Sequence, residues 1–335
     1  MDNYLITWFY AEKKEDESFY PSVGGNTSSS SYQKVYWRCV YDFFRTAQLT
    51  QRTTDIKYLF YTNVSHIPTN IDGVNLARFF KEMSIKVEQL ELTNRTPKDW
   101  YGAWRNQFYL FDVLNHLKNW YSGNFLILDS DIFIRKDLLP IFQDIEKHQV
   151  ITYDCGYSND TSVNGISITQ MRTLYSKFSQ NDRGGEDALR YKGGELIGIT
   201  SDLIPSVLDC YAELWKFNYK LYQKKQIKLN EEAHFLSVIY HHLGFDESLA
   251  NKYIKRMWTS VKCDNIEPGD EKFPLWHLPA EKKYAFKTGF AFLKNVHSEA
   301  EYKTYLCSLV HIPGNRTIRK IRKIILRIRE KYRKP

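Results

Sequence analysis

Cysteine is scarce in this chain, and its pattern excludes two classes of protein. The 335 residues include five cysteines, an odd number, and they are scattered without any C-x-x-C pair. This pattern argues against a disulfide framework and against a cysteine-rich zinc site, and it favours a reducing compartment. The chain also lacks a run of about 18 apolar residues, so we expect no segment that crosses a bilayer. Since a predicted strand begins almost at Met1, with no signal peptide before it, we expect a cytoplasmic protein.

Most of the chain has little net charge of either sign. The net charge is +8, yet residues 316–334 alone carry ten basic residues and one acidic residue. The remainder is therefore close to neutral, which argues against nucleic acid as a partner of the body.

The basic tail has a helical pattern of its own. Ile318, Ile321, Ile325 and Ile328 fall on one stripe, with arginines and lysines around the rest. Basic amphipathic helices are typical of segments that lie on an anionic membrane. We predict that residues 316–334 bind such a surface, on the inner face of the cytoplasmic membrane. The alternatives are a tail that binds nucleic acid and a helix that packs on a partner subunit.

Predicted strands and helices alternate along the chain. The expected strands are 4–10, 56–61, 85–92, 125–128, 150–153, 164–168 and one that follows the paired glycines in the segment 191–199. The expected helices are 32–49, 72–83, 98–120, 202–225 and one that opens at 229–236 with Asn230 as its cap. Such alternation predicts an α/β fold with a mixed, mainly parallel sheet flanked by helices. We expect one domain, residues 1–312, with mobile loops at about 12–31 and 176–192, followed by the tail 313–335.

One stretch carries the clearest chemical signal, residues 124–133 with the sequence NFLILDSDIF. Its apolar run, 125–128, does not alternate, as expected for a strand covered on both faces. Asp129 and Asp131 follow at once. Carboxylates at the end of a buried strand are costly unless they are neutralised, and open α/β sheets bind ligands at this edge. A divalent cation held by the two aspartates explains the pattern, and an ordinary turn is the alternative.

Other motifs supply candidate partners for this cation site. Arg105 lies on the helix before the strand, as a phosphate clamp or as a solvated arginine. Gly193 and Gly194 precede a later strand, where paired glycines allow close approach to the backbone or simply bend it. Glu231 and Glu232 open a helix, where acids also serve as ordinary caps. His277 is followed by Lys282 and Lys283, a grouping that fits a metal ligand beside a phosphate clamp better than a core histidine.

Taken together, these motifs resemble a GT-A glycosyltransferase over roughly residues 3–285. Asp129-Ser130-Asp131 is similar to the Asp-x-Asp motif of that fold, which holds a divalent cation under the diphosphate of a nucleotide-sugar. The order of motifs is closest to two retaining groups. One is family six, of the blood-group A/B and α-1,3-galactosyltransferase type. The other is family eight, of the glycogenin and lipooligosaccharide galactosyltransferase type, in which His277 and a following lysine are similar to a late His-x-x-Gly-x-Lys motif.

The resemblance implies a role for each motif. Asp129, Asp131 and His277 would bind the metal, and their mixed carboxylate and imidazole donors suit Mn²⁺ or Mg²⁺, with the imidazole favouring Mn²⁺. Glu232 stands in the place of the catalytic glutamate, and Glu231 in that of the residue before it. The implied donor-binding residues are Thr7, Tyr10, Arg105, Asp129, Ser130, Lys282 and Lys283. The implied acceptor-binding residues are Gly193, Gly194, Glu195 and His234.

The expected activity is metal-dependent transfer of a hexose from a UDP-linked sugar to a glycan or lipid-linked glycan acceptor, with retention rather than inversion. The setting that this implies is bacterial lipooligosaccharide or capsule synthesis. A sugar nucleotidyltransferase is the alternative enzyme, but residues 8–12 lack the glycine- and basic-rich loop usual after its first strand. A basic-tailed binding protein is the non-enzymatic alternative, and it would leave the clustered motifs without a common purpose.

Overall fold

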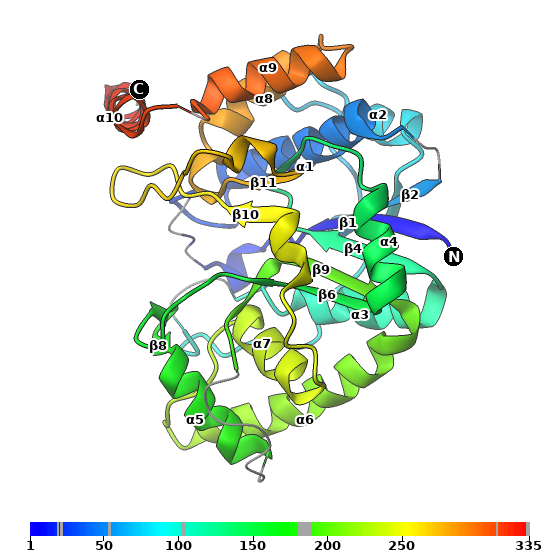
Figure 1. Cartoon of the computed structure of the whole chain (residues 1–335), viewed down its shortest axis with the longest axis vertical. Helices are drawn as coiled ribbons and strands as arrows, with labels where there is room; N and C mark the ends of the chain where they lie inside the picture. Colours follow the sequence, from blue (N-terminus) through cyan, green and yellow to red (C-terminus); the bar gives the residue numbers. More distant parts are fainter. Residues whose placement is uncertain are drawn as a thin grey trace.

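The structure is a computed structural model, and it describes residues 1–18, 20, 23–52, 55–101, 105–179, 189–312 and 314–332. Its larger sheet has six strands in the order β3-β2-β1-β4-β9-β6 (Figure 1). Strands β3, β2, β1 and β4 are parallel, whereas β9 is antiparallel to both β4 and β6. These strands are β1 Asn3–Phe9, β2 Ile56–Thr62, β3 Lys86–Gln89, β4 Asn124–Leu128, β6 Val150–Asp154 and β9 Lys192–Thr200. The prediction of an α/β fold with a mixed sheet is thus confirmed.

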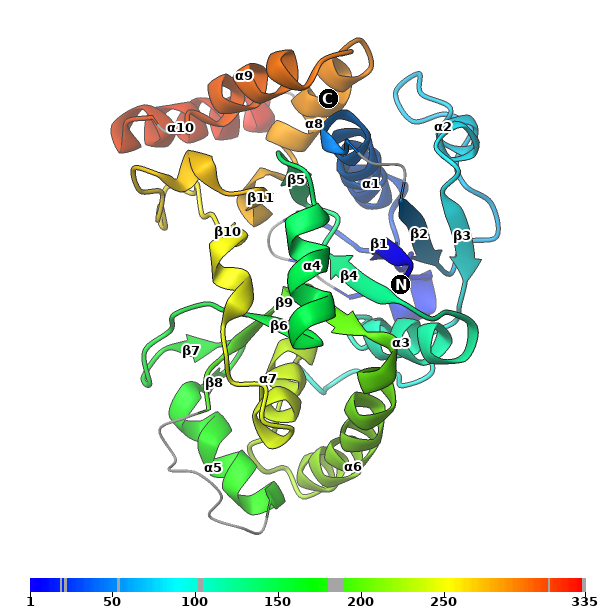
Figure 2. The same cartoon turned by 45° about the vertical axis from the view of Figure 1, so that its right-hand side comes forward.

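Helices cover both faces of this sheet (Figures 1 and 2). One core cluster joins the sheet to α1 Ser30–Thr50, α2 Leu76–Glu82, α4 Leu139–His148, α8 Ala285–Leu293 and α9 Glu299–Val310. The second cluster joins the other face to α3 Tyr109–Trp120, α5 Ile168–Ser179, α6 Ile204–Gln223 and α7 Glu232–His242. The last helix is α10, Arg316–Tyr332. Among the residues described, no helix is long and apolar enough to span a membrane.

Strand β4 lies between the two cores. Leu126 and Leu128 pack in the first cluster, and Phe125 and Ile127 pack in the second. Each of these four side chains is at most 2% exposed. Burial on both faces is the reason that this strand is continuously apolar, so the prediction from residues 125–128 is confirmed.

A smaller sheet lies beyond the end of β4, with strands in the order β10-β11-β5. Its strands are β5 Ile132–Ile134, β10 Ile254–Arg256 and β11 Leu275–His277, and β11 is antiparallel to β5. The chain passes from the larger sheet into the smaller one within three residues, Asp129 to Asp131. Short elements complete the described chain: β7 Ser162–Val163, β8 Ile166–Ser167, and 3-10 helices η1 Lys14–Asp16, η2 Ser201–Leu203, η3 Leu249–Lys252, η4 Asp270–Lys272 and η5 Pro279–Glu281.

One helix prediction and the bounds of one loop prediction differ from the structure. The helix expected over 98–120 begins only at Tyr109, because Trp100 stacks on Trp215 and donates its indole N–H to the Asn230 carbonyl, which holds the preceding chain in a turn. The expected flap over 176–192 begins inside α5, and residues 180–188 lie outside the described part.

Hydrogen bonds join distant residues of the loop predicted near 12–31, in its described part. Glu12, only 3% exposed, accepts hydrogen bonds from Ser18 and from Thr27. A buried carboxylate that gathers hydroxyl and backbone donors satisfies its own hydrogen-bonding capacity and fixes the loop around it. Residues 19, 21 and 22 of this loop lie outside the described part.

Candidate metal centre and the adjoining cavity

Strand pairing brings the two aspartates and the histidine together. Asp129 directly follows β4, and its backbone N–H donates to the Glu195 carbonyl at 3.1 Å. The β5–β11 register places His277 opposite Ile132, next to Asp131. The Leu278 N–H then donates to the Asp131 carbonyl at 3.1 Å, which fixes this crossing. Residues almost 150 positions apart in the sequence therefore meet at the end of the buried strand.

Asp129, Asp131 and His277 form a group that could hold a metal ion, since one ligand atom from each lies within 4.8 Å of the others. His277 Nε2 is 3.3 Å from Asp131 Oδ2 and 3.8 Å from Asp129 Oδ2. The side chains of Asp131 and His277 are 3% and 5% exposed, and that of Asp129 is 38% exposed. Two carboxylates and one imidazole fit Mn²⁺ or Mg²⁺, with an open side toward the solvent.

Protein cations neutralise this group in the structure. Lys282 forms an ion pair with Asp131. Burial acts to raise the pKa of Asp131, but the charges of Lys282 and His277 outweigh it and hold that pKa below its usual range. Partial burial and the Asp131 charge raise the pKa of Asp129 to about 6. Burial acts to lower the pKa of His277, yet the facing Asp131 raises it to about 9.

A carboxylate behind His277 fixes the direction of its ring. Glu195 Oε1 lies 3.2 Å from His277 Nδ1, and Arg256 Nε donates to the same oxygen at 2.7 Å. This contact turns Nε2 toward the two aspartates, the arrangement by which carboxylates orient metal-binding histidines. Burial acts to raise the pKa of Glu195, but Arg256 and His277 together hold it below its usual range.

Glu195, predicted as an acceptor-binding residue, is 1% exposed and lies behind the histidine, where it contacts His277 and Arg256. Sequence reasoning also missed Arg256, which lies next to His277 in the pairing of β10 with β11. The charge of Glu195 was the sequence signal that could have indicated such a residue, because an acid in the apolar run 195–199 needs a partner of opposite charge.

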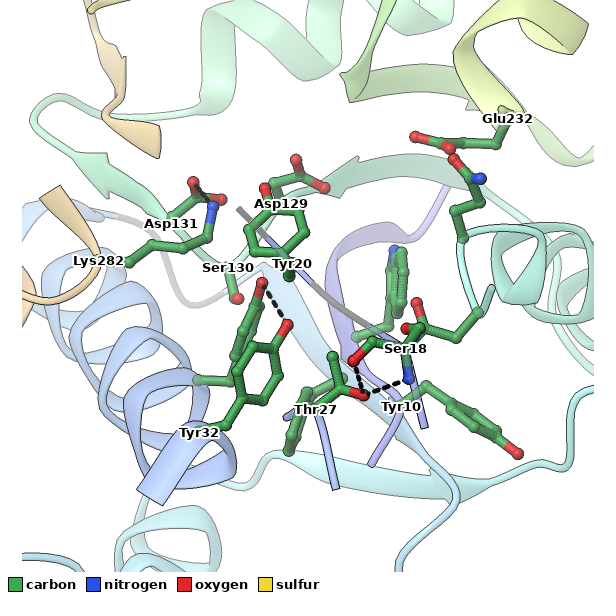
Figure 3. A pocket seen from close by; sticks show the side chains of 15 residues that line it. Tyr10, Ser18, Tyr20, Thr27, Tyr32, Asp129, Ser130, Asp131, Glu232 and Lys282 are labelled. Carbon is green, nitrogen blue, oxygen red and sulfur yellow. Dashed lines mark hydrogen bonds and ion pairs between the residues drawn. The ribbon is translucent and has the colours of Figure 1, made fainter. Parts of the chain in front are cut away.

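A cavity adjoins the candidate metal centre (Figure 3). Asp129, Ser130, Asp131 and Lys282 line it from one side, and the tyrosines Tyr20, Tyr32 and Tyr36 lie beside them. The Lys282 ammonium lies 5.4 Å from the Tyr20 ring centroid and 5.9 Å from that of Tyr36. Charged and aromatic groups thus share one wall. Such a wall combines a site for anionic oxygens with flat rings on which a base or sugar can stack.

Glu232 lines the cavity at some distance from Lys282, on the far side of Asp129 (Figure 3). It is the first residue of α7, and its Oε2 is buried without a hydrogen-bond partner among the described residues. Burial first, then the charges of Glu231 and Asp129, raise the pKa of Glu232 well above its usual value. A Cβ at Gly194 would lie 3.0 Å from Glu232 Oε1, so a glycine there leaves room for the carboxyl group.

The neighbours of Glu232 are structural in this arrangement. Glu231 occupies the N-cap position of α7 and accepts a hydrogen bond from the Tyr191 hydroxyl at 2.8 Å. Asn230, predicted as the cap, instead donates its side-chain amide to the Asn164 carbonyl. His234 is 1% exposed and its Nδ1 lies 3.3 Å from the Asn230 backbone nitrogen. Neither Glu231 nor His234 lines the cavity.

The predicted donor-binding residues divide into two groups. Tyr10, Asp129, Ser130 and Lys282 line the cavity. Three other predicted residues do not line it, namely Thr7, Arg105 and Lys283.

The contacts and burial of these residues explain why they do not line the cavity. Thr7 is fully buried inside β1. Arg105 donates from Nε and Nη2 to the Thr96 carbonyl and borders a separate hollow. Lys282 and Lys283 are consecutive residues, and it is Lys282 that forms the ion pair with Asp131.

In comparisons with known proteins, the chain matches no protein-family model and no curated protein. The fold and site therefore define the class by themselves: a mixed α/β protein with a candidate cation site at the end of a central strand, beside a cavity.

Proposed function

We propose that this protein is a metal-dependent glycosyltransferase of GT-A type, which moves a hexose from a nucleotide-sugar, UDP-linked in our proposal, to a glycan or lipid-linked glycan. The observation that carries the proposal is the convergence of Asp129, Asp131 and His277 at one cavity that also contains Lys282 and, at a distance, Glu232. Transfer from such a donor expels a diphosphate, whose developing charge must be stabilised. A metal-binding group, a lysine and a separate carboxyl group are the parts that this chemistry requires.

The candidate ligands fit Mn²⁺ or Mg²⁺, and a divalent cation bound there would act as a Lewis acid for the diphosphate oxygens. Lys282 is the residue of this chain that we assign to the phosphates. It is now paired with Asp131, and its ammonium would be available to a donor phosphate once another cation satisfies that carboxylate. The tyrosine wall offers stacking surfaces for the nucleoside or the sugar.

Glu232 is our candidate for the residue that faces the reacting sugar. Burial and the charges of Glu231 and Asp129 raise its pKa and so favour the protonated form. A positive charge that develops on a nearby sugar ring would favour its carboxylate form. A carboxylate on the face opposite the leaving group is suited to a reaction with retention of configuration, by attack or by charge stabilisation.

The test is a titration of Mn²⁺ with a panel of UDP-sugars, read as thermal stability and as transfer, with the anomeric configuration of the product determined by NMR. Donor stabilisation that requires metal supports the proposal. Stabilisation by nucleoside triphosphates instead indicates nucleotidyl transfer, and no response to either indicates a binding protein.

Asp131→Ala should abolish both transfer and metal-dependent donor binding, because it removes the ligand most enclosed by the other groups. Asp160→Ala is the matched control, because Asp160 is exposed and belongs neither to the candidate metal-binding group nor to the cavity lining. Near-normal turnover of the Asp131 variant would refute the metal-site assignment.

A further inference from the structure

Helix α10 exposes its apolar side chains. Its isoleucines are 44–52% exposed, namely Ile318, Ile321, Ile324, Ile325 and Ile328. None of them belongs to the core clusters of the described chain. We call these five side chains the isoleucine face. A contiguous apolar face of this kind marks a surface that binds something.

The opposite side of α10 is charged and is held against the body. Arg319 forms two hydrogen bonds with Asp264, both at 2.9 Å. Arg322 and Lys323 pair with Glu281 at 3.0 and 2.7 Å. The side chains of Arg319 and Lys323 are each 3% exposed. The usual orientation of an amphipathic helix, apolar side inward, is thus reversed here, and buried ion pairs hold the helix in that orientation.

Basic groups remain around the isoleucine face. Arg316 and Arg327 are exposed, and Lys320 is partly exposed. Two copies of the helix placed face to face would bring these like charges together, which opposes self-association. An anionic lipid surface instead meets both features, since it accepts apolar side chains and attracts arginine and lysine.

We propose that the isoleucine face of α10 is a docking surface for an anionic lipid bilayer, and that the Asp264 and Glu281 ion pairs hold it in a fixed orientation on the body. Figures 1 and 2 show α10 at the same end of the molecule as α8 and α9. Glu281 immediately precedes Lys282, which pairs with Asp131. The bilayer would therefore be held at a defined position relative to the candidate metal centre. This proposal is independent of the glycosyl-transfer proposal.

The experiment is flotation of the full chain with vesicles of phosphatidylcholine alone or mixed with phosphatidylglycerol. Wild-type protein should float with the mixed vesicles and much less with the neutral ones, and added salt should weaken its binding, because exposed charges are screened. The double variant Ile321→Ser/Ile325→Ser should lose about tenfold or more of its vesicle binding. Both positions are exposed, so folding is expected to be unaffected.

The matched control is Trp120→Ser/Ile227→Ser, which removes two exposed apolar side chains elsewhere, 73% and 55% exposed. It should bind vesicles as the wild type does. Equal flotation of all three proteins would overturn the proposal. So would a wild-type dimer, measured by analytical ultracentrifugation, that becomes monomeric in the α10 variant, or binding to an oligonucleotide in preference to vesicles.

Discussion

At the scale of single residues, we expect Glu195, which contacts His277 Nδ1, to affect the affinity for a metal ion. Glu195 orients the imidazole and forms an ion pair with Arg256, whose side chain is 16% exposed. Glu195→Gln keeps an oxygen acceptor but removes the charge, so the ring is held less firmly and becomes less basic. We expect Mn²⁺ affinity, measured by calorimetry, to fall about tenfold or more, as is usual when the partner of a metal-binding histidine is changed.

The control for this variant is Glu267→Gln, because that side chain is 76% exposed and pairs only with Lys255 in the described structure. It should leave the Mn²⁺ affinity unchanged. An unchanged affinity in the Glu195 variant would mean that His277 is not a metal ligand.

Asp42 supports a second prediction at this scale. It is fully buried in α1, and both its carboxylate oxygens lack a hydrogen-bond partner among the described residues. Burial raises the pKa of Asp42 well above its usual value. The folded state therefore holds a proton that the unfolded state releases above pH ~4, and the stability contributed by this group falls as pH rises from there.

We expect Asp42→Asn to stabilise the protein by about 1–3 kcal/mol at neutral pH, because the amide is neutral without binding a proton and each unit of raised pKa corresponds to about 1.4 kcal/mol. The advantage should shrink toward pH ~4, where the aspartate is protonated in both states. Denaturant unfolding of the two proteins across this pH range measures it. A variant that is less stable than the wild type at neutral pH would show that Asp42 is ionised and paired.

At the scale of elements, the segment 275–282, which consists of β11, η5 and the residue after η5, links three parts of the molecule. It carries His277 at the candidate metal centre, Glu281 under α10, and Lys282 beside Asp131. Glu281 is fully buried and also accepts a hydrogen bond from Thr259 at 2.6 Å. The position of α10 and the position of Lys282 therefore depend on the same short piece of backbone.

We expect the double variant Arg322→Met/Lys323→Met to lose about 3–5 kcal/mol of stability, because it leaves the Glu281 carboxylate buried without its cations. Adding Glu281→Met should restore much of the loss, since all three charges are then gone. Thermal and denaturant unfolding measure both changes. A double variant as stable as the wild type would show that α10 is not held by these pairs.

At the scale of the whole molecule, much of the fold follows from sequence pattern. The apolar run 125–128 marks a strand buried on both faces, and the two aspartates after it mark the site, because these are local consequences of burial. The meeting with His277 could be anticipated only from the resemblance to a known family. It is produced by the β5–β11 register, which local pattern does not encode.

What could not be predicted depends on contacts between distant residues. The partnership of Glu195 with Arg256 spans 61 positions, and the reversed orientation of α10 depends on acids at 264 and 281. The late start of α3 depends on Trp100 packing against α6. In each case a long-range contact overrides or completes what the local pattern indicates.

The last prediction concerns the response of the whole protein to metal and pH. A bound Mn²⁺ stabilises the folded state in proportion to the logarithm of its affinity. The facing Asp131 raises the pKa of the proposed ligand His277 to about 9, so below that pH its proton must leave when the metal binds. Asp129, whose pKa is about 6, adds a second competing proton at lower pH.

Metal affinity therefore rises with pH over this range. The increase in Tm caused by Mn²⁺ should grow from pH ~6 to ~9, EDTA should reverse it, and Asp131→Ala should abolish it. A Tm increase that is equal at both ends of this range would show that the metal binds elsewhere.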